Sequence, residues 1–431
     1  MSKPLLKDLP NLVQAGIITP EVAQRITEYY QSQKSISSNK FNTVLGILGA
    51  LLVGFGIVLV VAHNWDLFNR ATQTVFAFLP LAIAQGLCIY TLLRKKDSIV
   101  WRESSATLLF FSVAACISLI SQIYHINEPL SDFILTWMLL TIPLVYLLSS
   151  SLVSLLVIGC STWYACLVGY HDIFSSGHTD VPWLYLVLLL LLMPYYIRFI
   201  RFNHESNFFH LHNWFLTASL VITLGAFAEH YHFRFVFAGY LCMFGVFYLL
   251  GNTRFFKDNK LFANPQLIVG ISGTLFVLLF WSFNEFWDEG IDKGFFDSPF
   301  FITILSLLLL AGYLNIKHNK PQFDPVGFSP YLFLIALFIY RGFNAASPFL
   351  VNLWVLAIAV FYIRRGSLRN HFGILNFGLI IIALLAIMRF FDDSIPFIWR
   401  GLFFVAAGAG FFVANYLLLK KRKAISQKTS V

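Results

Sequence analysis

An uninterrupted apolar run, TVLGILGALLVGFGIVLVVA at residues 43–62, is the feature that most constrains how this chain folds. A helix of about 20 apolar residues crosses the hydrocarbon core of a bilayer. Hydrophobic residues make up 58% of the 431 residues and charged residues only 12%, whereas a soluble domain has about 25% charged residues. We therefore expect lipid to surround much of the chain.

The apolar runs predict helices and not a transmembrane β-barrel. A barrel strand is a segment of about 10 residues with alternating polarity, but runs such as LYLVLLLLLMPYYI at 184–197 are longer and apolar throughout. The expected fold class is all-α: a polytopic transmembrane helix bundle of about fourteen spans. The spans are expected near residues 43–63, 71–93, 104–125, 132–149, 151–170, 182–200, 211–230, 233–251, 266–286, 297–316, 328–341, 347–364, 371–390 and 397–419.

The charges of the linkers predict the orientation of this bundle. Excess Lys and Arg stays on the cytoplasmic side of a membrane protein, and with a cytoplasmic N-terminus most of the 30 Lys and Arg fall in cytoplasmic segments. The predicted organisation is a cytoplasmic helical hairpin at 1–42, the transmembrane bundle at 43–419 and a basic cytoplasmic tail at 420–431. The net charge of +9 then reflects topology, and we expect no nucleic-acid partner.

Residues 1–42 are the one soluble segment of this scheme. They contain no apolar core followed by a cleavage site of small residues, so no signal peptide is expected. Gly16 ends a first short helix, and Thr19-Pro20-Glu21 is typical of the start of a second. The segment is interpreted as a hairpin on the cytoplasmic face, with a docking site for a protein partner as the alternative.

Several short stretches within residues 5–130 resemble a bacterial family of predicted membrane proteins, domain-of-unknown-function family 2157. They are, in order, AGIITPEVAQRI (15–26), AHNWD (62–66), RKK (94–96), WRES (101–104) and SQIYHI (121–126). The resemblance implies an integral protein of the bacterial inner membrane. It implies no activity, so it assigns no catalytic residue.

A polar cluster is expected at the outer ends of the first three spans. Consecutive helices usually pack as neighbours, so its members can share a pocket for a head group, sugar or ion. The favoured interpretation is a polar rim in which Asn64 and Asp66 cap helices and Trp65 anchors the interface, and the shared pocket is the alternative. The candidate residues are His63, Asp66, Arg70, Gln122, Tyr124 and His125.

Arg102 and Glu103 are candidate contacts at the inner mouth of the third span. They are interpreted as an anchor at the cytoplasmic interface, with a gating contact to the N-terminal hairpin as the alternative.

The sequence supports no catalytic residue, cofactor or metal site. Glu229, His230 and His232 lie in one turn, but they are too few to predict a metal centre. Phosphate-loop, zinc-protease and serine-hydrolase motifs are absent. No Asp, Glu or Lys lies in the middle of a span, which argues against a pump with a carboxylate proton relay.

Three functions remain open. The first is a carrier or flippase for an amphipathic or lipid-linked solute, which a cavity within the bilayer would favour. The second is a membrane-embedded enzyme acting on a lipid-linked substrate at the outer face, with Asp66 and His125 close together. The third is a structural or assembly protein, which a tightly packed bundle without a cavity would favour.

Overall fold

The described part of the computed structural model is mainly helical and contains no strand. The structure describes residues 9, 12–27, 65–170, 181–202, 206–228, 233–253, 256, 261–287, 299–318, 324–340 and 346–392, together with 396–398, 400–402, 404–405, 408–410 and 412. The expected first span, 43–63, lies outside these residues, and only fragments of the last, 397–419, lie within them.

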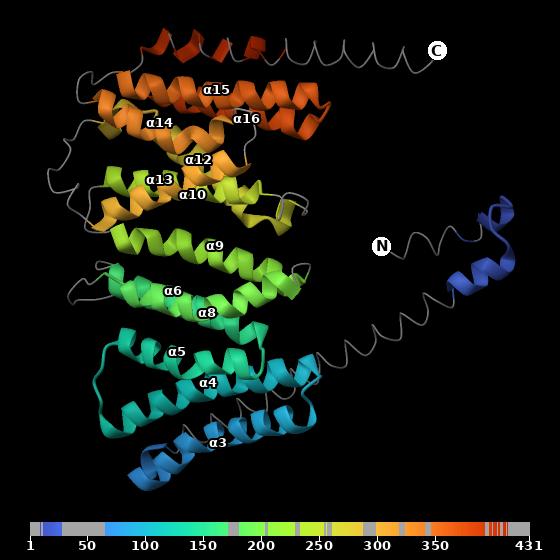
Figure 1. Ribbon diagram of the computed structural model, residues 1–431, viewed down its shortest axis with the longest axis vertical. Coiled ribbons are helices and arrows are strands. Elements are labelled where there is room, and N and C mark those ends of the chain that lie inside the picture. The colour runs from blue at the N-terminus through green and yellow to red at the C-terminus, as the bar shows by residue number, and fades with distance from the viewer. Residues whose placement is uncertain are drawn as a thin grey trace. The chain divides into compact units, whose positions relative to one another are not determined.

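Within the described residues, twelve helices of 16 to 26 residues lie where the twelve remaining spans are expected (Figure 1). They are α3 (Arg70–Arg94), α4 (Ile99–Tyr124), α5 (Leu130–Leu147), α6 (Ser151–Gly169), α8 (Trp183–Phe202), α9 (Asn207–Ala228), α10 (Phe233–Gly251), α12 (Pro265–Phe280), α13 (Pro299–His318), α14 (Pro325–Tyr340), α15 (Ala346–Leu368) and α16 (Phe372–Phe390). The described part also contains the 3-10 turns η1 (Trp65–Leu67), η2 (Leu261–Ala263) and η3 (Asn284–Trp287).

Nine helices of the described part are long and apolar enough to cross a membrane. Three shorter apolar segments, Phe235–Gly251, Pro265–Phe280 and Pro325–Ala336, complete the set of twelve. The predicted helical membrane bundle is therefore confirmed as a fold class.

A serine run divides two of these helices. Residues 132–170 are almost continuously apolar, but α5 ends at Leu147 and α6 begins at Ser151. Ser149 has a left-handed backbone with φ 49°, and the Ser150 side chain accepts a hydrogen bond from the Val153 N–H. A short polar side chain that satisfies a free backbone amide favours the start of a new helix, so two helices form where hydropathy alone allows one.

The chain divides into two compact units, Met1–Leu79 with Gln122–Tyr124, and Pro80–Ser121 with His125–Val431. The larger unit has two apolar cores. One joins α4, α5, α6, α8 and the start of α9, with Ile134, Met138 and Tyr185 fully buried. The other is built around α10 and α12 and extends to α16.

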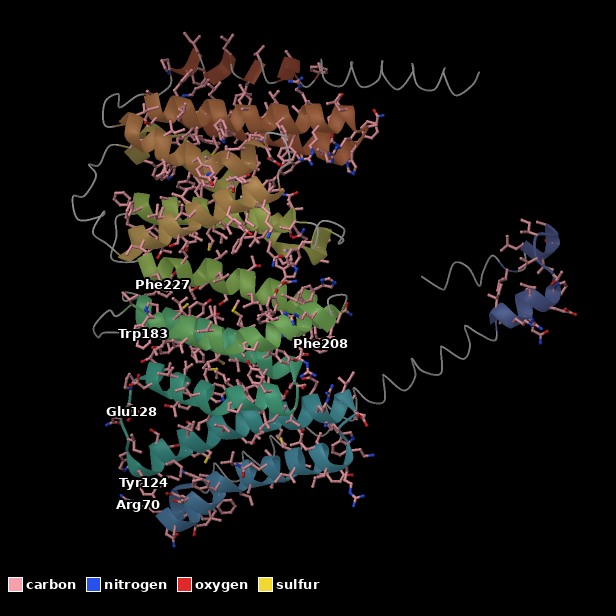
Figure 2. All side chains as sticks on the ribbon, in the orientation of Figure 1. Arg70, Tyr124, Glu128, Trp183, Phe208 and Phe227 are labelled. Atoms are coloured by element: carbon pink, nitrogen blue, oxygen red, sulfur yellow. The ribbon has the colours of Figure 1, made fainter. Side chains whose placement is uncertain are left out.

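The helices of the larger unit alternate in direction from α5 to α9. Figure 2 places Glu128, Trp183 and Phe227 at one end of these helices and Phe208 at the other. We call the end marked by Phe208 the basic end, because α8 finishes there with Arg198 and Arg201.

Candidate functional site

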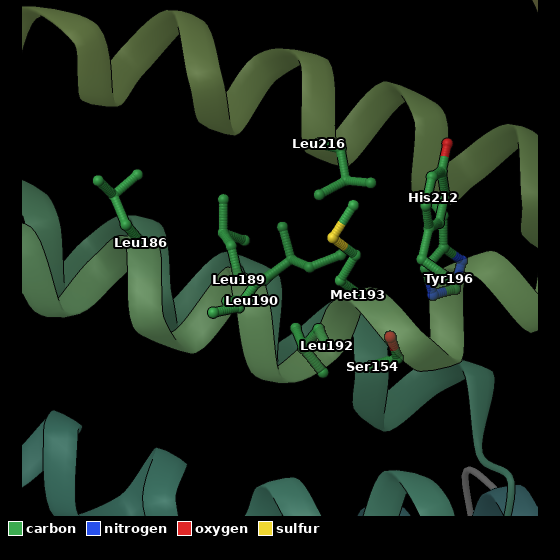
Figure 3. Close-up of a pocket in the computed structure, with 10 residues that line it drawn as sticks. Ser154, Leu186, Leu189, Leu190, Leu192, Met193, Tyr196, His212 and Leu216 are labelled. Carbon is green, nitrogen blue, oxygen red and sulfur yellow. The ribbon is translucent and has the colours of Figure 1, made fainter.

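A cavity of about 260 Å³ lies among α6, α8 and α9 (Figure 3). Its wall is mostly hydrocarbon, with three residues that carry a hydroxyl or imidazole group. The lining residues are Ser154, Ile158, Leu186, Leu189, Leu190, Leu192, Met193, Tyr196, His212 and Leu216. Small-molecule pockets usually measure about 300–1,000 Å³, so this cavity suits one part of a larger amphipathic molecule.

One long side of the cavity is open to the surroundings of the protein. Leu186, Leu190 and Met193 of α8 are 52%, 65% and 52% exposed. Between Leu186 and Tyr196 the cavity follows α8 for about 15 Å, given a rise of about 1.5 Å per residue. That length is half of the roughly 30 Å hydrocarbon core of a bilayer, and the exposed side chains are all apolar, so the opening faces lipid.

The polar end of the cavity contains a buried histidine with one unused ring nitrogen. His212 is 1% exposed, and its Nδ1 lies 2.7 Å from the Phe208 carbonyl oxygen of the preceding helical turn. The Nε2 atom has no hydrogen-bond partner among the described residues. A buried polar atom without a partner costs free energy, and Nε2 has under 1 Å² of accessible surface, so it is closed off from the cavity in this structure.

A second layer of polar groups lies behind His212. The Tyr196 hydroxyl donates a hydrogen bond to Asn213 Oδ1, and Gln266 Nε2 of α12 donates to the same oxygen over 3.4 Å. Asn213 Nδ2 and Gln266 Oε1 have no partner within the described ranges. The cavity wall is thus linked through Tyr196 to a buried amide pair with further hydrogen-bonding capacity.

Tyr195 connects this end of α8 to the start of α6. Its hydroxyl lies 3.1 Å from Ser151 Oγ, and its ring packs 6.4 Å from the His212 ring between centroids. Ser151 in turn donates its backbone N–H to Glu103 over 2.9 Å. The start of α6, the end of α8 and the start of α9 are therefore held together at the basic end.

Glu103, one of the two expected inner-mouth residues, caps α6. One carboxylate oxygen accepts the Ser151 N–H, and the other accepts the Leu152 N–H over 3.0 Å and the Ser150 hydroxyl. An anion at a helix N-terminus satisfies free amides and interacts favourably with the helix dipole. Arg102 is partly buried, with no partner for Nε among the described residues. An anchoring or gating role for Arg102 and Glu103 stays a prediction.

The expected outer cluster is described only in part. His63 lies outside the described residues, and so does the side chain of Asp66. Phe68 and Asn69 interrupt the helix between η1 and α3, so Asp66 and Arg70 do not lie on one continuous helix.

The described members of that cluster lie at helix ends. Arg70, Gln122, Tyr124 and His125 are all exposed, and the Tyr124 hydroxyl lies 3.3 Å from Thr74 Oγ1. Gln122 and Tyr124 belong to the smaller unit and His125 to the larger one. A shared site that includes His125 therefore stays a prediction.

Sequence reasoning missed His212, Asn213 and Gln266, because each lies within six residues of a helix start. Polar residues in such positions usually face the membrane interface, and these three are buried instead. The turn that contains Glu229, His230 and His232, whose pattern was too weak to predict a metal centre, lies outside the described residues.

A largely covered acid was missed as well, since the Asp324 side chain is 13% exposed. Asp324 precedes α14 and accepts a hydrogen bond from the Tyr248 hydroxyl, with Arg365 at 3.9 Å. Burial raises the pKa of the Asp324 carboxyl above its usual value, an effect that Tyr248, the Val326 amide and Arg365 partly oppose. No local pattern around Asp324 indicates burial, because its partners come from α10 and α15.

The described helices and their lipid-exposed apolar surfaces define an integral membrane protein of the helix-bundle class. Residues 10–154 match the model of one family, described as Predicted membrane protein (DUF2157). The predicted resemblance over residues 5–130 is therefore confirmed. No curated protein and no solved structure matches the chain.

Proposed function

We propose that the protein is a carrier of the flippase type for an amphipathic membrane molecule. One observation carries the proposal: the cavity between α6, α8 and α9 is open along an apolar side and ends at the buried His212. A molecule with a hydrocarbon chain and a polar group enters such a site from lipid without passing through water. The helix bundle then allows the polar group to cross the apolar interior of the bilayer.

The proposal includes the cellular setting. The membrane is the bacterial inner membrane, the basic end faces the cytoplasm and both termini lie on that side. This orientation is supported by the excess of Lys and Arg in one set of linkers. The partners are the bilayer and an amphipathic or lipid-linked solute, and the segment 1–42 offers a further surface for a protein partner.

The other two functions receive less support. A tightly packed bundle without a cavity was the condition that favoured a structural or assembly role, and the cavity argues against it. An enzyme at the outer face requires Asp66 close to His125, and the Asp66 side chain lies outside the described residues.

The test is lipid movement across proteoliposomes that contain the purified full chain. A lipid with a fluorescent head group is placed in both leaflets, and a quencher that cannot cross the bilayer is added outside. We expect the protein to bring inner-leaflet lipid to the outer leaflet faster than protein-free vesicles do. In Leu216→Trp the larger ring occupies the cavity, and we expect the rate to fall at least about fivefold, the effect of roughly 1 kcal/mol.

Leu211→Trp is the matched control. Leu211 lies on the same helix, is 45% exposed and does not line the cavity, so the rate is expected to stay at the wild-type level. Equal rates for wild-type vesicles and protein-free vesicles, or an equal loss in both Trp variants, would contradict the proposal.

A further inference from the structure

One carboxylate connects α10, α14 and α15. Asp324 lies directly before α14, and it accepts hydrogen bonds from the Tyr248 hydroxyl of α10 and, over 3.2 Å, from the Val326 amide of α14. Arg365 of α15 lies 3.9 Å from the same carboxylate, which is beyond the length of a hydrogen bond. The groups that bond directly to this acid are therefore neutral, and its counter-charge stays at a distance.

Behind the carboxylate, two tyrosine hydroxyls continue into the bundle. The Tyr362 hydroxyl of α15 donates to the Tyr248 hydroxyl over 3.5 Å, and the two residues are 7% and 2% exposed. A hydroxyl both donates and accepts, whereas a carboxylate only accepts and a protonated carboxyl group also donates. Tyr248 can therefore accept a hydrogen bond from a protonated Asp324 and turn its own hydrogen toward Tyr362. The site suits both forms of the acid without movement of a helix.

The charges near this site do not neutralise the acid. In the helices that pack against α14, α12 contains no titratable residue, Lys317 of α13 bonds to the Tyr313 hydroxyl over 2.9 Å, and Arg364 of α15 is exposed. The Arg365 side chain is 27% exposed and that of Asp324 is 13% exposed, so water weakens their attraction and solution reaches the carboxyl group. Burial accordingly raises the pKa of Asp324 above its usual value.

We propose that Asp324 is a proton-binding site, and that proton binding breaks the ion pair through which Arg365 of α15 holds the start of α14. As an anion, the carboxylate attracts the guanidinium and accepts the Tyr248 and Val326 hydrogen bonds. As a neutral acid, it donates to Tyr248, and the partly exposed Arg365 turns to water. The proton comes from the solution, so no other reactant is needed. The inference goes beyond the proposed carrier function and does not depend on it.

Infrared spectroscopy of the full chain in nanodiscs measures the proton directly. The band of protonated carboxyl groups is followed as the pH rises, and the difference between wild type and Asp324→Asn isolates the band of Asp324. We expect this band to persist to a pH above the usual range of an aspartate. Asp132→Asn is the matched control, because it removes an exposed acid from the first turn of α5. It is expected to keep the Asp324 band.

Two neighbouring variants test the surroundings of the acid. Tyr248→Phe removes a donor that favours the charged form, and Arg365→Gln removes the attracting cation. Each is therefore expected to move the Asp324 titration to still higher pH. Lys317→Gln is the control for the loss of a cation, because Lys317 bonds to Tyr313 instead. It is expected to leave the titration unchanged.

The pH dependence of stability tests the contact with Arg365. A raised pKa in the folded state means that the unfolding midpoint falls as the pH rises through that pKa, and this fall is expected to be absent in Asp324→Asn. Arg365 also lies over the Phe361 ring at 5.7 Å, a contact that remains at every pH. Arg365→Gln is therefore expected to lower the midpoint more above the Asp324 titration than below it. In the Asp324→Asn background this difference disappears.

The outcomes are separate from those for the carrier function, which is tested by lipid movement. Loss of the Asp324 band within the usual range of an aspartate, or a fall of the midpoint with pH that persists in Asp324→Asn, overturns the proton site. An equal effect of Arg365→Gln above and below the titration overturns control of the ion pair by the proton. If Asp324→Asn does not fold, an infrared titration that is identical in wild type, Tyr248→Phe and Arg365→Gln overturns the proposal.

Discussion

Glu103 shows how one side chain determines where two helices meet. The carboxylate comes from the first turns of α4, and its three donors are all at the start of α6. The free amides of a helix N-terminus have no partner within the helix itself. In a chain with few charges, an acid in this position stabilises the contact between α4 and α6 through directed, charge-assisted hydrogen bonds.

Removing the Glu103 carboxylate is expected to destabilise the larger unit. Glu103→Ala leaves the Ser151 and Leu152 amides without their partner, at an expected cost of about 1–3 kcal/mol. Glu103→Gln keeps one acceptor and is expected to cost less. Thermal unfolding of the purified protein in detergent measures both effects.

Glu128→Ala is the control, since Glu128 is exposed in the linker before α5. A midpoint for Glu103→Ala as high as that for Glu128→Ala would show that the cap contributes nothing to stability.

At the scale of helices, α10 and α12 pack with backbone close to backbone. A Cβ built on Gly270 of α12 would lie 2.7 Å from Tyr248 Cα, and one on Gly251 of α10 would lie 2.8 Å from Leu267 Cα. Small residues permit this close approach between membrane helices, where van der Waals packing contributes much of the association energy. Tyr248, on the α10 side of this contact, also bonds to Asp324.

Gly270→Ala is therefore expected to force α10 and α12 apart. Overpacking of this kind typically costs about 1–3 kcal/mol, so the thermal unfolding midpoint should fall. Gly86→Ala in α3 is the matched control variant, because a Cβ at Gly86 meets no atom within 4 Å. It is expected to be neutral or slightly stabilising, since Ala favours helix more than Gly does. Equal midpoints for the two variants would contradict the close contact.

The helices could be predicted from the sequence more fully than the cavity. Long apolar runs determine where helices cross a bilayer, and the serines at 149–151 were enough to separate α5 from α6. The burial of His212 depends instead on Tyr195 and Phe199 of α8, whose rings pack at 6.4 and 5.3 Å from its own. These partners are brought together by tertiary packing, so no periodicity near His212 indicates a site.

For the whole molecule, the exposed surface is the strongest sign of a lipid environment. In the apolar 18-residue stretch of α16, only 17% of the residues are buried inside the structure, and in that of α3 only 22% are. Ile316, Leu309 and Phe349 are 84%, 68% and 70% exposed. Soluble monomers rarely expose a continuous apolar surface of this size to water. The hydrocarbon of a bilayer solvates such a surface.

The orientation of the bundle determines which end of each helix faces the cytoplasm. It therefore also determines to which leaflet of the bilayer the cavity opens. With the basic end inside, His212 lies in the cytoplasmic half of the bilayer, and the proposed carrier collects its substrate from the inner leaflet. With the opposite orientation the same cavity would serve the outer leaflet.

Reporter fusions measure that orientation directly. A reporter active only in the cytoplasm and one active only outside it are fused after Lys96, Glu128 and Asn370 and at both termini of the full chain. We expect cytoplasmic activity after Lys96 and Asn370 and at both termini, and external activity after Glu128. Termini on opposite sides of the membrane, or external activity after Lys96, would contradict the proposed orientation.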